Sequence, residues 1–198
     1  HVMWGAADDN MWLEFQSYAA MGYTVFFCNP RGSGGYGESF QKVLRGQWGP
    51  LAMDDIMAGV DTLIARGLVD ESRMFVTGGS YGGYMTAWIA AHTDRFKAAV
   101  SVRGVYNLLS FFATSDIPSF VRDELGYLPL DNPQFLWDVS PLAHAHRITT
   151  PMLIMHSEND FRVPISEGEQ LFGYLRRAGV ETEFVRYPRE GHELTRAG

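Results

Sequence analysis

Apolar residues along this chain fall into two patterns. Short, nearly continuous runs rich in β-branched and aromatic residues lie at 23–28, 73–78, 97–102, 151–156 and 182–188. Longer stretches with apolar positions three and four residues apart lie at 11–22, 50–67, 84–93 and 164–179. The first pattern predicts buried strands and the second predicts amphipathic helices. Because strands and helices alternate, we expect a mostly parallel sheet flanked by helices.

The segment 103–150 is less regular than the rest of the chain. It contains four prolines that interrupt any helical period, Pro118, Pro129, Pro133 and Pro141. We therefore expect an insertion with short helices. No internal repeat, low-complexity tract or linker is visible, so residues 1–198 are interpreted as one α/β domain.

Charge and composition exclude several classes of protein. The formal net charge is −7, which gives no general attraction to nucleic acid or to an anionic membrane. The apolar runs are far shorter than the roughly 18 residues that a membrane-spanning helix needs. The single cysteine, Cys28, requires no oxidising compartment and is expected to be a buried strand thiol. These features favour a soluble cytoplasmic protein.

A glycine-rich motif surrounds one serine. Residues 78–82 read Gly-Gly-Ser-Tyr-Gly and stand between a predicted strand and a predicted helix. This G-x-S-x-G pattern is typical of a sharp strand-to-helix turn that exposes the serine hydroxyl above a sheet. Ser80 is then a candidate nucleophile, and the backbone N–H of Tyr81 is a candidate oxyanion donor. The alternative is a glycine-rich turn with an incidental serine.

A serine nucleophile needs a base and an orienting acid. In α/β-hydrolases the chain order is serine, then acid, then histidine, and each follows a strand. Here Glu158, Asn159 and Asp160 follow one predicted strand, and His192 follows the next. His192 is therefore the candidate base, while spacing alone does not choose the acid.

Four motifs together resemble one known family. The stretches TGGSYGGYMT, NPRGSGGYG, HSENDFRVP and REGHE are similar to the catalytic domain of prolyl oligopeptidase family serine peptidases, most of all its acylaminoacyl-peptidase branch. The resemblance implies an α/β-hydrolase fold and favours Asp160 as the acid of a D-x-R-V-P loop. It also implies that Arg162 holds a carbonyl of the bound peptide and that Val163 lines the specificity pocket. The alternative for Arg162 is a surface ion pair with Glu158 or Asp160.

The ends of the chain suggest a partial domain. If residues 11–22 form the first helix of the fold, residues 1–10 are the end of the loop that supplies a second oxyanion donor. HVMWG resembles the residues that come after a His-Gly-Gly-Pro-like stretch in the family, and a closing helix is expected after His192. We therefore expect the first strands, the upstream loop and the final helix to be missing. The resemblance also implies a β-propeller domain in the full-length parent.

Residues 31–37 suggest a different function, the binding of a dinucleotide cofactor. Gly32, Gly34 and Gly37 have the G-x-G-x-x-G spacing of a dinucleotide-binding turn, with Asp54 and Asp55 further along. Three residues separate the predicted strand from the first glycine, and a tyrosine and a glutamate lie where pyrophosphate would bind. A structural loop is favoured, and no cofactor is expected.

Two further groups of residues have weaker signals. His144 and His146 have the spacing of metal ligands on a strand, but no further cysteine or histidine accompanies them, so no metal is expected. Tyr106, Phe111 and Phe112 follow a predicted strand and could line a substrate pocket near Ser80. Core packing explains these rings equally well.

The sequence therefore predicts a serine peptidase that hydrolyses short peptides or acyl-peptides through an acyl-enzyme. Peptidase specificity is implied by the resemblance, as an aminopeptidase, acylaminoacyl-peptidase or oligopeptidase type. A carboxylesterase with the same triad, a non-catalytic hydrolase-like module and a dinucleotide-dependent oxidoreductase are the alternatives. An oligomer is compatible with the sequence.

Overall fold

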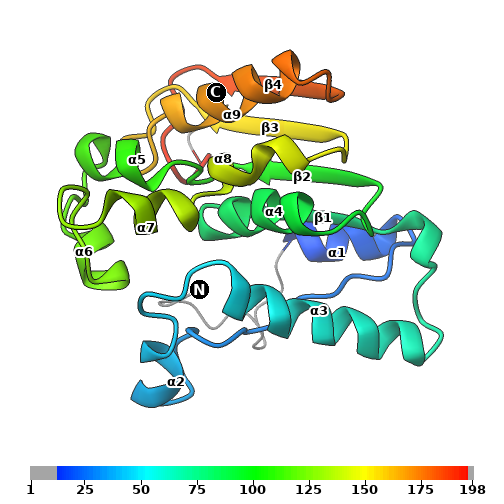
Figure 1. The fold of residues 1–198 in the computed structure, drawn as a ribbon. Helices are drawn as coiled ribbons and strands as arrows, with labels where there is room; N and C mark the ends of the chain where they lie inside the picture. Colours follow the sequence, from blue (N-terminus) through cyan, green and yellow to red (C-terminus); the bar gives the residue numbers. More distant parts are fainter. Residues whose placement is uncertain (1–12, 196–198) are drawn as a thin grey trace. The chain divides into compact units, whose positions relative to one another are not determined.

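A computed structural model describes residues 13–195 (Figure 1). The chain divides between Ser72 and Arg73 into two compact units, which are described separately. The predicted end of an upstream loop at residues 1–10 lies outside the described residues.

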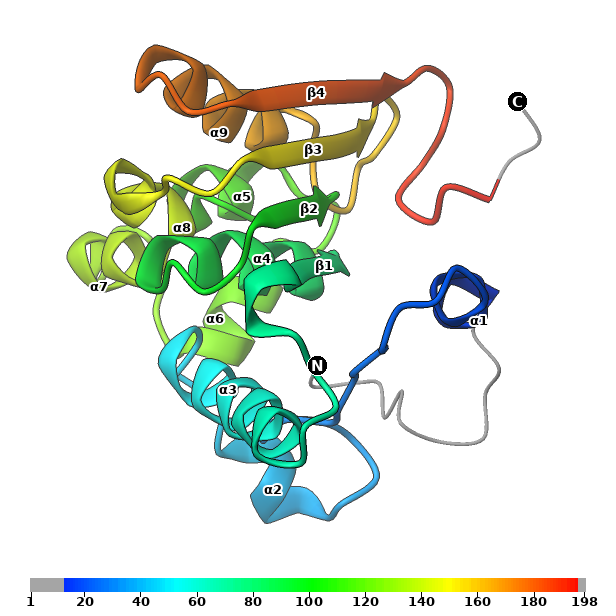
Figure 2. The ribbon, with the colours of Figure 1, turned by 90° about the vertical axis from the view of Figure 1, so that its right-hand side faces the viewer.

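The second unit is built on a sheet of four parallel strands in chain order. The strands are β1 (Phe75–Gly79), β2 (Ala98–Val102), β3 (Met152–Ser157) and β4 (Thr182–Tyr187). All four arrows point the same way in Figure 2. Each strand coincides with a predicted run to within two residues, and the predicted parallel sheet flanked by helices is confirmed.

Helices connect these strands. They are α4 (Tyr81–His92), α5 (Leu108–Thr114), α6 (Phe120–Leu125), α7 (Pro133–Asp138), α8 (Pro141–His144) and α9 (Ser166–Arg177), with the one-turn 3₁₀ helix η2 (Ala145–Arg147). Another one-turn 3₁₀ helix, η1 (Glu71–Arg73), precedes β1. The helices α5–α8 form the predicted insertion. Its prolines do not only break helices, because Pro133 and Pro141 begin α7 and α8, where a missing N–H costs no hydrogen bond.

Helices α4 and α9 pack on the same face of the sheet (Figures 1 and 2). Ala87 and Ala91 of α4 and Leu171 and Leu175 of α9 share one buried core with Ile154 of β3. The small alanine side chains let α4 approach the strands closely. This packing holds α4, and with it the turn that precedes it, in a fixed position on the sheet.

The first unit contains α1 (Leu13–Ala20), α2 (Glu38–Lys42) and α3 (Pro50–Ala65). The prediction of a strand at residues 23–28 is wrong, because the structure has no strand there. A strand requires a hydrogen-bonded neighbour, and an apolar run does not specify one. Cys28 is accordingly no strand thiol, although it is half-buried and burial raises its pKa.

The glycine-rich loop of this unit is held by a charged contact. The guanidinium of Arg31 pairs with Asp55 at 2.7 Å, and the backbone N–H of Arg31 donates to the same carboxylate at 2.7 Å. Gly32 has a φ of 100°, and a Cβ there would lie 2.7 Å from the side chain of Leu44. The first glycine and the second acidic residue of the dinucleotide-like pattern thus both have structural roles.

Candidate active site

Ser80 lies at the turn between β1 and α4. Its φ of 59° and ψ of −118° are strained for a residue with a side chain. The N–H of Ser80 donates to the carbonyl of Val102 at 2.9 Å, and its carbonyl accepts from the N–H of Tyr84 at 3.0 Å. The end of one strand and the first turn of one helix therefore meet at the serine, which is the arrangement the motif predicts.

The glycines around Ser80 are not equally necessary for this turn. A Cβ at Gly78 would lie 2.6 Å from the Gly82 carbonyl carbon, and a Cβ at Gly83 would lie 2.6 Å from the Val102 carbonyl oxygen. A Cβ at Gly82 itself would meet nothing within 4 Å. Close backbone approach thus requires glycine at positions 78 and 83, and position 82 does not share this requirement.

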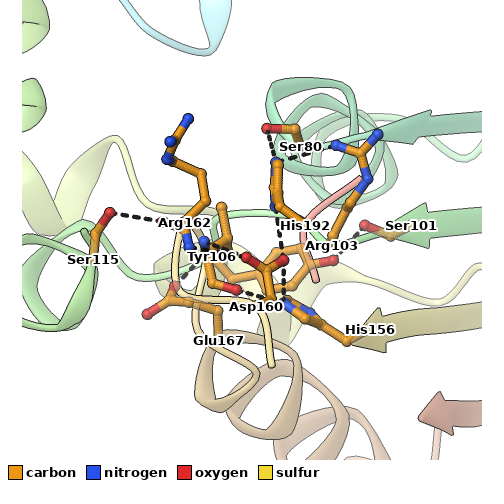
Figure 3. A network of polar contacts seen from close by, with 11 residues as sticks. Ser80, Ser101, Arg103, Tyr106, Ser115, His156, Asp160, Arg162, Glu167 and His192 are labelled. Atoms are coloured by element: carbon orange, nitrogen blue, oxygen red, sulfur yellow. Dashed lines mark hydrogen bonds and ion pairs between the residues drawn. The ribbon is translucent and has the colours of Figure 1, made fainter. Parts of the chain in front are cut away.

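Ser80, His192 and Asp160 form a chain of hydrogen bonds (Figure 3). His192 Nε2 lies 3.0 Å from Ser80 Oγ, and His192 Nδ1 lies 2.7 Å from Asp160 Oδ2. The Asp160 side chain is fully buried and that of His192 is 12% exposed. Since a carboxylate only accepts, Nδ1 carries a proton directed at Asp160. Nε2 is then the nitrogen that faces the serine hydroxyl.

The second carboxylate oxygen of Asp160 is fixed by its own loop. Oδ1 accepts the backbone N–H groups of Arg162 at 3.0 Å and of Val163 at 2.8 Å. These bonds leave Oδ2 directed at His192. The three side chains follow β1, β3 and β4, whose carboxyl ends meet at one edge of the sheet, where α/β proteins commonly bind ligands.

Arg103 also belongs to this edge, although the sequence motifs did not point to it. It follows β2 directly, with a φ of 44° and an N–H that donates to the Met155 carbonyl at 2.7 Å. Its Nη1 lies 3.1 Å from His192 Nε2, the same nitrogen that faces Ser80 (Figure 3). The position after a strand, which identified His192 and narrowed the acid to residues 158–160, could have identified Arg103 too.

His156 lies behind Asp160 and is fully buried. Its Nε2 lies 2.8 Å from the Val163 carbonyl oxygen, to which it donates, and 3.6 Å from Asp160 Oδ2. Burial lowers the pKa of His156, and the neighbouring Asp160 carboxylate opposes this change only in part. We therefore treat His156 as a neutral imidazole with its proton on Nε2.

A buried carboxylate fixes the loop that follows Arg103. Glu167 in α9 accepts the backbone N–H groups of Tyr106 at 2.9 Å and Asn107 at 2.7 Å, and the hydroxyl of Ser110 at 2.6 Å. Burial raises the pKa of Glu167, and these hydrogen bonds act in the opposite direction. Glu167 thereby ties helix α9 to the loop after β2, which starts at the same carboxyl edge of the sheet as the candidate site.

Comparison with known proteins identifies the family. The profile of the Prolyl oligopeptidase family matches residues 10–198. The chain belongs to the prolyl oligopeptidase family. The resemblance inferred from the four motifs is thus confirmed.

Individual relatives of this family carry peptidase names. The chain is 46% identical over 200 residues to the "Uncharacterized peptidase YuxL" of Bacillus subtilis (strain 168), over 100% of this chain and 30% of that protein. It is 34% identical to the "Acylamino-acid-releasing enzyme" of Arabidopsis thaliana, over 90% of this chain and 24% of that protein. The structure of the Pyrococcus horikoshii acylaminoacyl peptidase matches with a TM-score of 0.80 and 34% identity, over 83% of this chain and 27% of that one. The chain thus spans about a third or less of these relatives.

Arg162, which the prolyl oligopeptidase resemblance implies for substrate binding, pairs with neither predicted acid. Its Nε lies 2.6 Å from Asp116 Oδ1, in the segment between α5 and α6. Its guanidinium points away from the Asp160 carboxylate (Figure 3). Ser115 additionally donates its hydroxyl to the Arg162 carbonyl at 2.7 Å. Asp116 therefore sets the direction of the Arg162 side chain.

The other predicted substrate contacts are less accessible. Tyr106 is fully buried, and its hydroxyl lies 2.6 Å from that of Ser101. Val163 is 2% exposed. The burial of these two side chains argues against direct contact with a substrate, and Tyr106 belongs to the buried core, which favours the core-packing alternative. Phe112 is half-buried and stays a candidate contact.

The histidine pair considered for metal binding has other contacts. His144 Nε2 lies 2.7 Å from the Asp138 carbonyl oxygen, and its ring lies 4.9 Å from that of His92. Within residues 13–195, no group of three or more histidine, cysteine, aspartate or glutamate side chains could hold a metal ion. In the same range no helix is long and apolar enough to cross a membrane.

Proposed function

We propose that the protein is a serine peptidase that hydrolyses peptide bonds of short peptides through an acyl-enzyme. The observation that carries the proposal is the hydrogen-bonded chain from Ser80 through His192 to Asp160, at 3.0 Å and 2.7 Å. Its occurrence in a family whose relatives are named as peptidases supports peptide bonds as the target. The activity is proposed for the whole protein, because this chain spans about a third or less of the relatives that carry peptidase names.

In the proposed reaction His192 Nε2 takes the proton of Ser80 as Oγ attacks the scissile carbonyl carbon. Asp160 holds the imidazole in the required tautomer and stabilises the imidazolium that forms. The backbone N–H of Tyr81, at the start of α4, donates to the developing oxyanion. The peptide C–N bond then breaks, His192 gives its proton to the leaving nitrogen, and water hydrolyses the acyl-enzyme by the same steps.

The substrate class follows from the relatives and from the candidate binding residues. Relatives are named as an acylamino-acid-releasing enzyme and as dipeptidyl-peptidase 5. We propose acyl-peptides or short peptides as substrates, with Arg162 holding a carbonyl on the acyl side. A β-propeller in the full-length parent, a cytoplasmic location and independence of any cofactor are parts of the same proposal.

The test is covalent labelling of the full-length protein with a fluorophosphonate probe, followed by identification of the labelled residue. We expect labelling at Ser80 and none in Ser80→Ala, whose kcat should fall on the order of a million-fold. Hydrolysis of matched peptide and ester substrates then separates a peptidase from a carboxylesterase. An unlabelled Ser80 in the folded protein would refute the proposal and favour a non-catalytic module.

A further inference from the structure

Arg103 is a partly buried cation at the edge of the candidate active site. Its Nε is enclosed and has no hydrogen-bond partner, and among residues 13–195 no carboxylate forms an ion pair with it. This is unexpected in a chain with 23 acidic and 16 basic residues. A cation removed from water is costly unless it is paired, so an unpaired guanidinium beside a candidate active site is suited to an anionic group of a substrate.

The position of the guanidinium indicates where that anion binds. Arg103 Nη1 lies 3.1 Å from His192 Nε2, which itself lies 3.0 Å from Ser80 Oγ. When a serine peptidase cleaves a peptide bond, Nε2 of the catalytic histidine is the atom that passes a proton to the leaving nitrogen. A group within hydrogen-bond distance of Nε2 therefore lies beside the leaving group. The oxyanion donor is a different group, the Tyr81 N–H at the start of α4.

We infer that Arg103 binds the free carboxylate of a one-residue leaving group, so that the enzyme preferentially releases single C-terminal amino acids. This inference rests on the proposed peptidase function. In a terminal residue the carboxylate carbon is two covalent bonds from the leaving nitrogen, which places it close to the guanidinium. The planar guanidinium suits two parallel hydrogen bonds to a carboxylate. A longer leaving peptide has a neutral carbonyl at that place.

Two backbone features make Arg103 a firm anchor. Its left-handed backbone, with a φ of 44°, is held by the bond from its N–H to the Met155 carbonyl at 2.7 Å. Its guanidinium rests against Gly79, where an added Cβ would lie 3.3 Å from Cζ. Binding of a carboxylate would also draw Nη1 from His192 Nε2 and leave that nitrogen to Ser80. The substrate's own carboxylate would thus help to free the base.

The test compares N-acetyl-Phe-Ala with its C-terminal amide on the full-length protein. The two differ only in the charge at the proposed contact. We expect kcat/KM for the free acid to exceed that for the amide on the order of 100-fold, as for a charge whose close partner is removed. In Arg103→Gln the free acid should lose most of this advantage, while Arg103→Lys should keep part of it. Arg122→Gln, which alters an exposed pair with Asp123, is the matched control and should keep the full ratio.

Labelling of Ser80 by a fluorophosphonate separates the two proposals. Equal rates for acid and amide in a labelled wild-type protein, or no cleavage of the acid, would overturn the role of Arg103 alone. Absence of labelling would remove the peptidase function and this inference with it. An equal loss for both substrates in Arg103→Gln would mean that Arg103 only positions His192. Because equal wild-type rates would already overturn the inference, the test stands even where a variant fails to fold.

Discussion

The imidazole of His156 lies 3.6 Å from the carboxylate of Asp160, and both side chains are fully buried. Its hydrogen bond, however, goes to the Val163 carbonyl at 2.8 Å. As a neutral ring His156 supports the acid loop without taking the Asp160 charge. As a cation it would compete with His192 for that charge, so the lowered pKa of His156 keeps Asp160 available to His192.

This arrangement predicts a pH-dependent stability. The pKa of His156 is lower in the folded than in the unfolded protein, so the unfolded state binds its proton first as the pH falls below about 6.5. Stability is therefore complete above that pH and is lost as the pH falls toward the folded pKa. The variant His156→Gln keeps an N–H donor but cannot titrate. Between about pH 6.5 and pH 5 its free energy of unfolding should fall less steeply than that of the wild type, and the two slopes should differ by at most about 1.4 kcal/mol per pH unit.

Thermal unfolding of the full-length protein at several pH values checks this prediction. His146→Gln, a change at an exposed histidine, is the control and should follow the wild-type curve. Parallel pH profiles for the wild type and His156→Gln would contradict a neutral buried His156.

A small chemical change at Glu167 should have a large effect on the stability of the protein. In Glu167→Gln the amide oxygen can still accept both backbone N–H groups, but an NH₂ group replaces the oxygen that accepts the Ser110 hydroxyl, and hydrogen bonds to a carboxylate become weaker hydrogen bonds to a neutral amide. We expect a loss of about 2–4 kcal/mol in the free energy of unfolding. Glu169→Gln, on the same helix but exposed, should cost less than about 1 kcal/mol. Denaturant unfolding of both variants measures the difference, and similar losses would show that the buried network is not what stabilises this region.

Strand pattern and chain order were enough to predict that Ser80, His192 and an acid among residues 158–160 form one group, and the family resemblance was needed to choose Asp160. Each follows a strand of a parallel sheet, and parallel strands end at one edge, so local signals implied a distant contact. The same logic applies to Arg103, but no motif surrounds it. Position after a strand is therefore a signal in its own right, even where a motif is absent.

Other features depend on packing that no local pattern specifies. The contact of Glu167 with the loop at Tyr106 joins residues 61 positions apart and exists only because α9 packs beside that loop. The burial of Tyr106 follows from the same packing. The run at 23–28 has the composition of a strand, yet pairing with a neighbour decides whether a strand forms.

Asp116 predicts an effect on substrate binding. Its carboxylate holds Arg162 Nε at 2.6 Å, and both side chains are nearly half exposed. Asp116→Asn should change the stability by less than about 1 kcal/mol, because exposed ion pairs contribute little. If Arg162 holds a substrate carbonyl, the variant should raise KM for peptides several-fold and leave kcat nearly unchanged. Steady-state kinetics with a peptide and a small ester check this. An unchanged KM for the peptide would mean that Asp116 has no role in substrate binding.

In the Ser80 turn, a glycine outside the G-x-S-x-G motif should matter more for stability than a glycine inside it. Gly82 belongs to the G-x-S-x-G motif, yet a Cβ there has open space, and alanine favours a helix over glycine by about 1 kcal/mol. Gly82→Ala should therefore preserve or raise the free energy of unfolding. Gly83 lies outside the motif, but its Cβ would lie 2.6 Å from the Val102 carbonyl oxygen and 2.8 Å from the Gly104 Cα.

Both of these atoms are backbone atoms, so α4 would have to move away from β2 to admit the methyl group. Gly83→Ala should destabilise the protein by about 3 kcal/mol or more, in the range of severe overpacking. It should also weaken fluorophosphonate labelling, because Ser80 N–H is bonded to the same Val102 carbonyl at 2.9 Å. Unfolding of the two variants side by side decides the matter. A greater loss in Gly82→Ala than in Gly83→Ala would mean that the helix and the strand are not in the close contact described here.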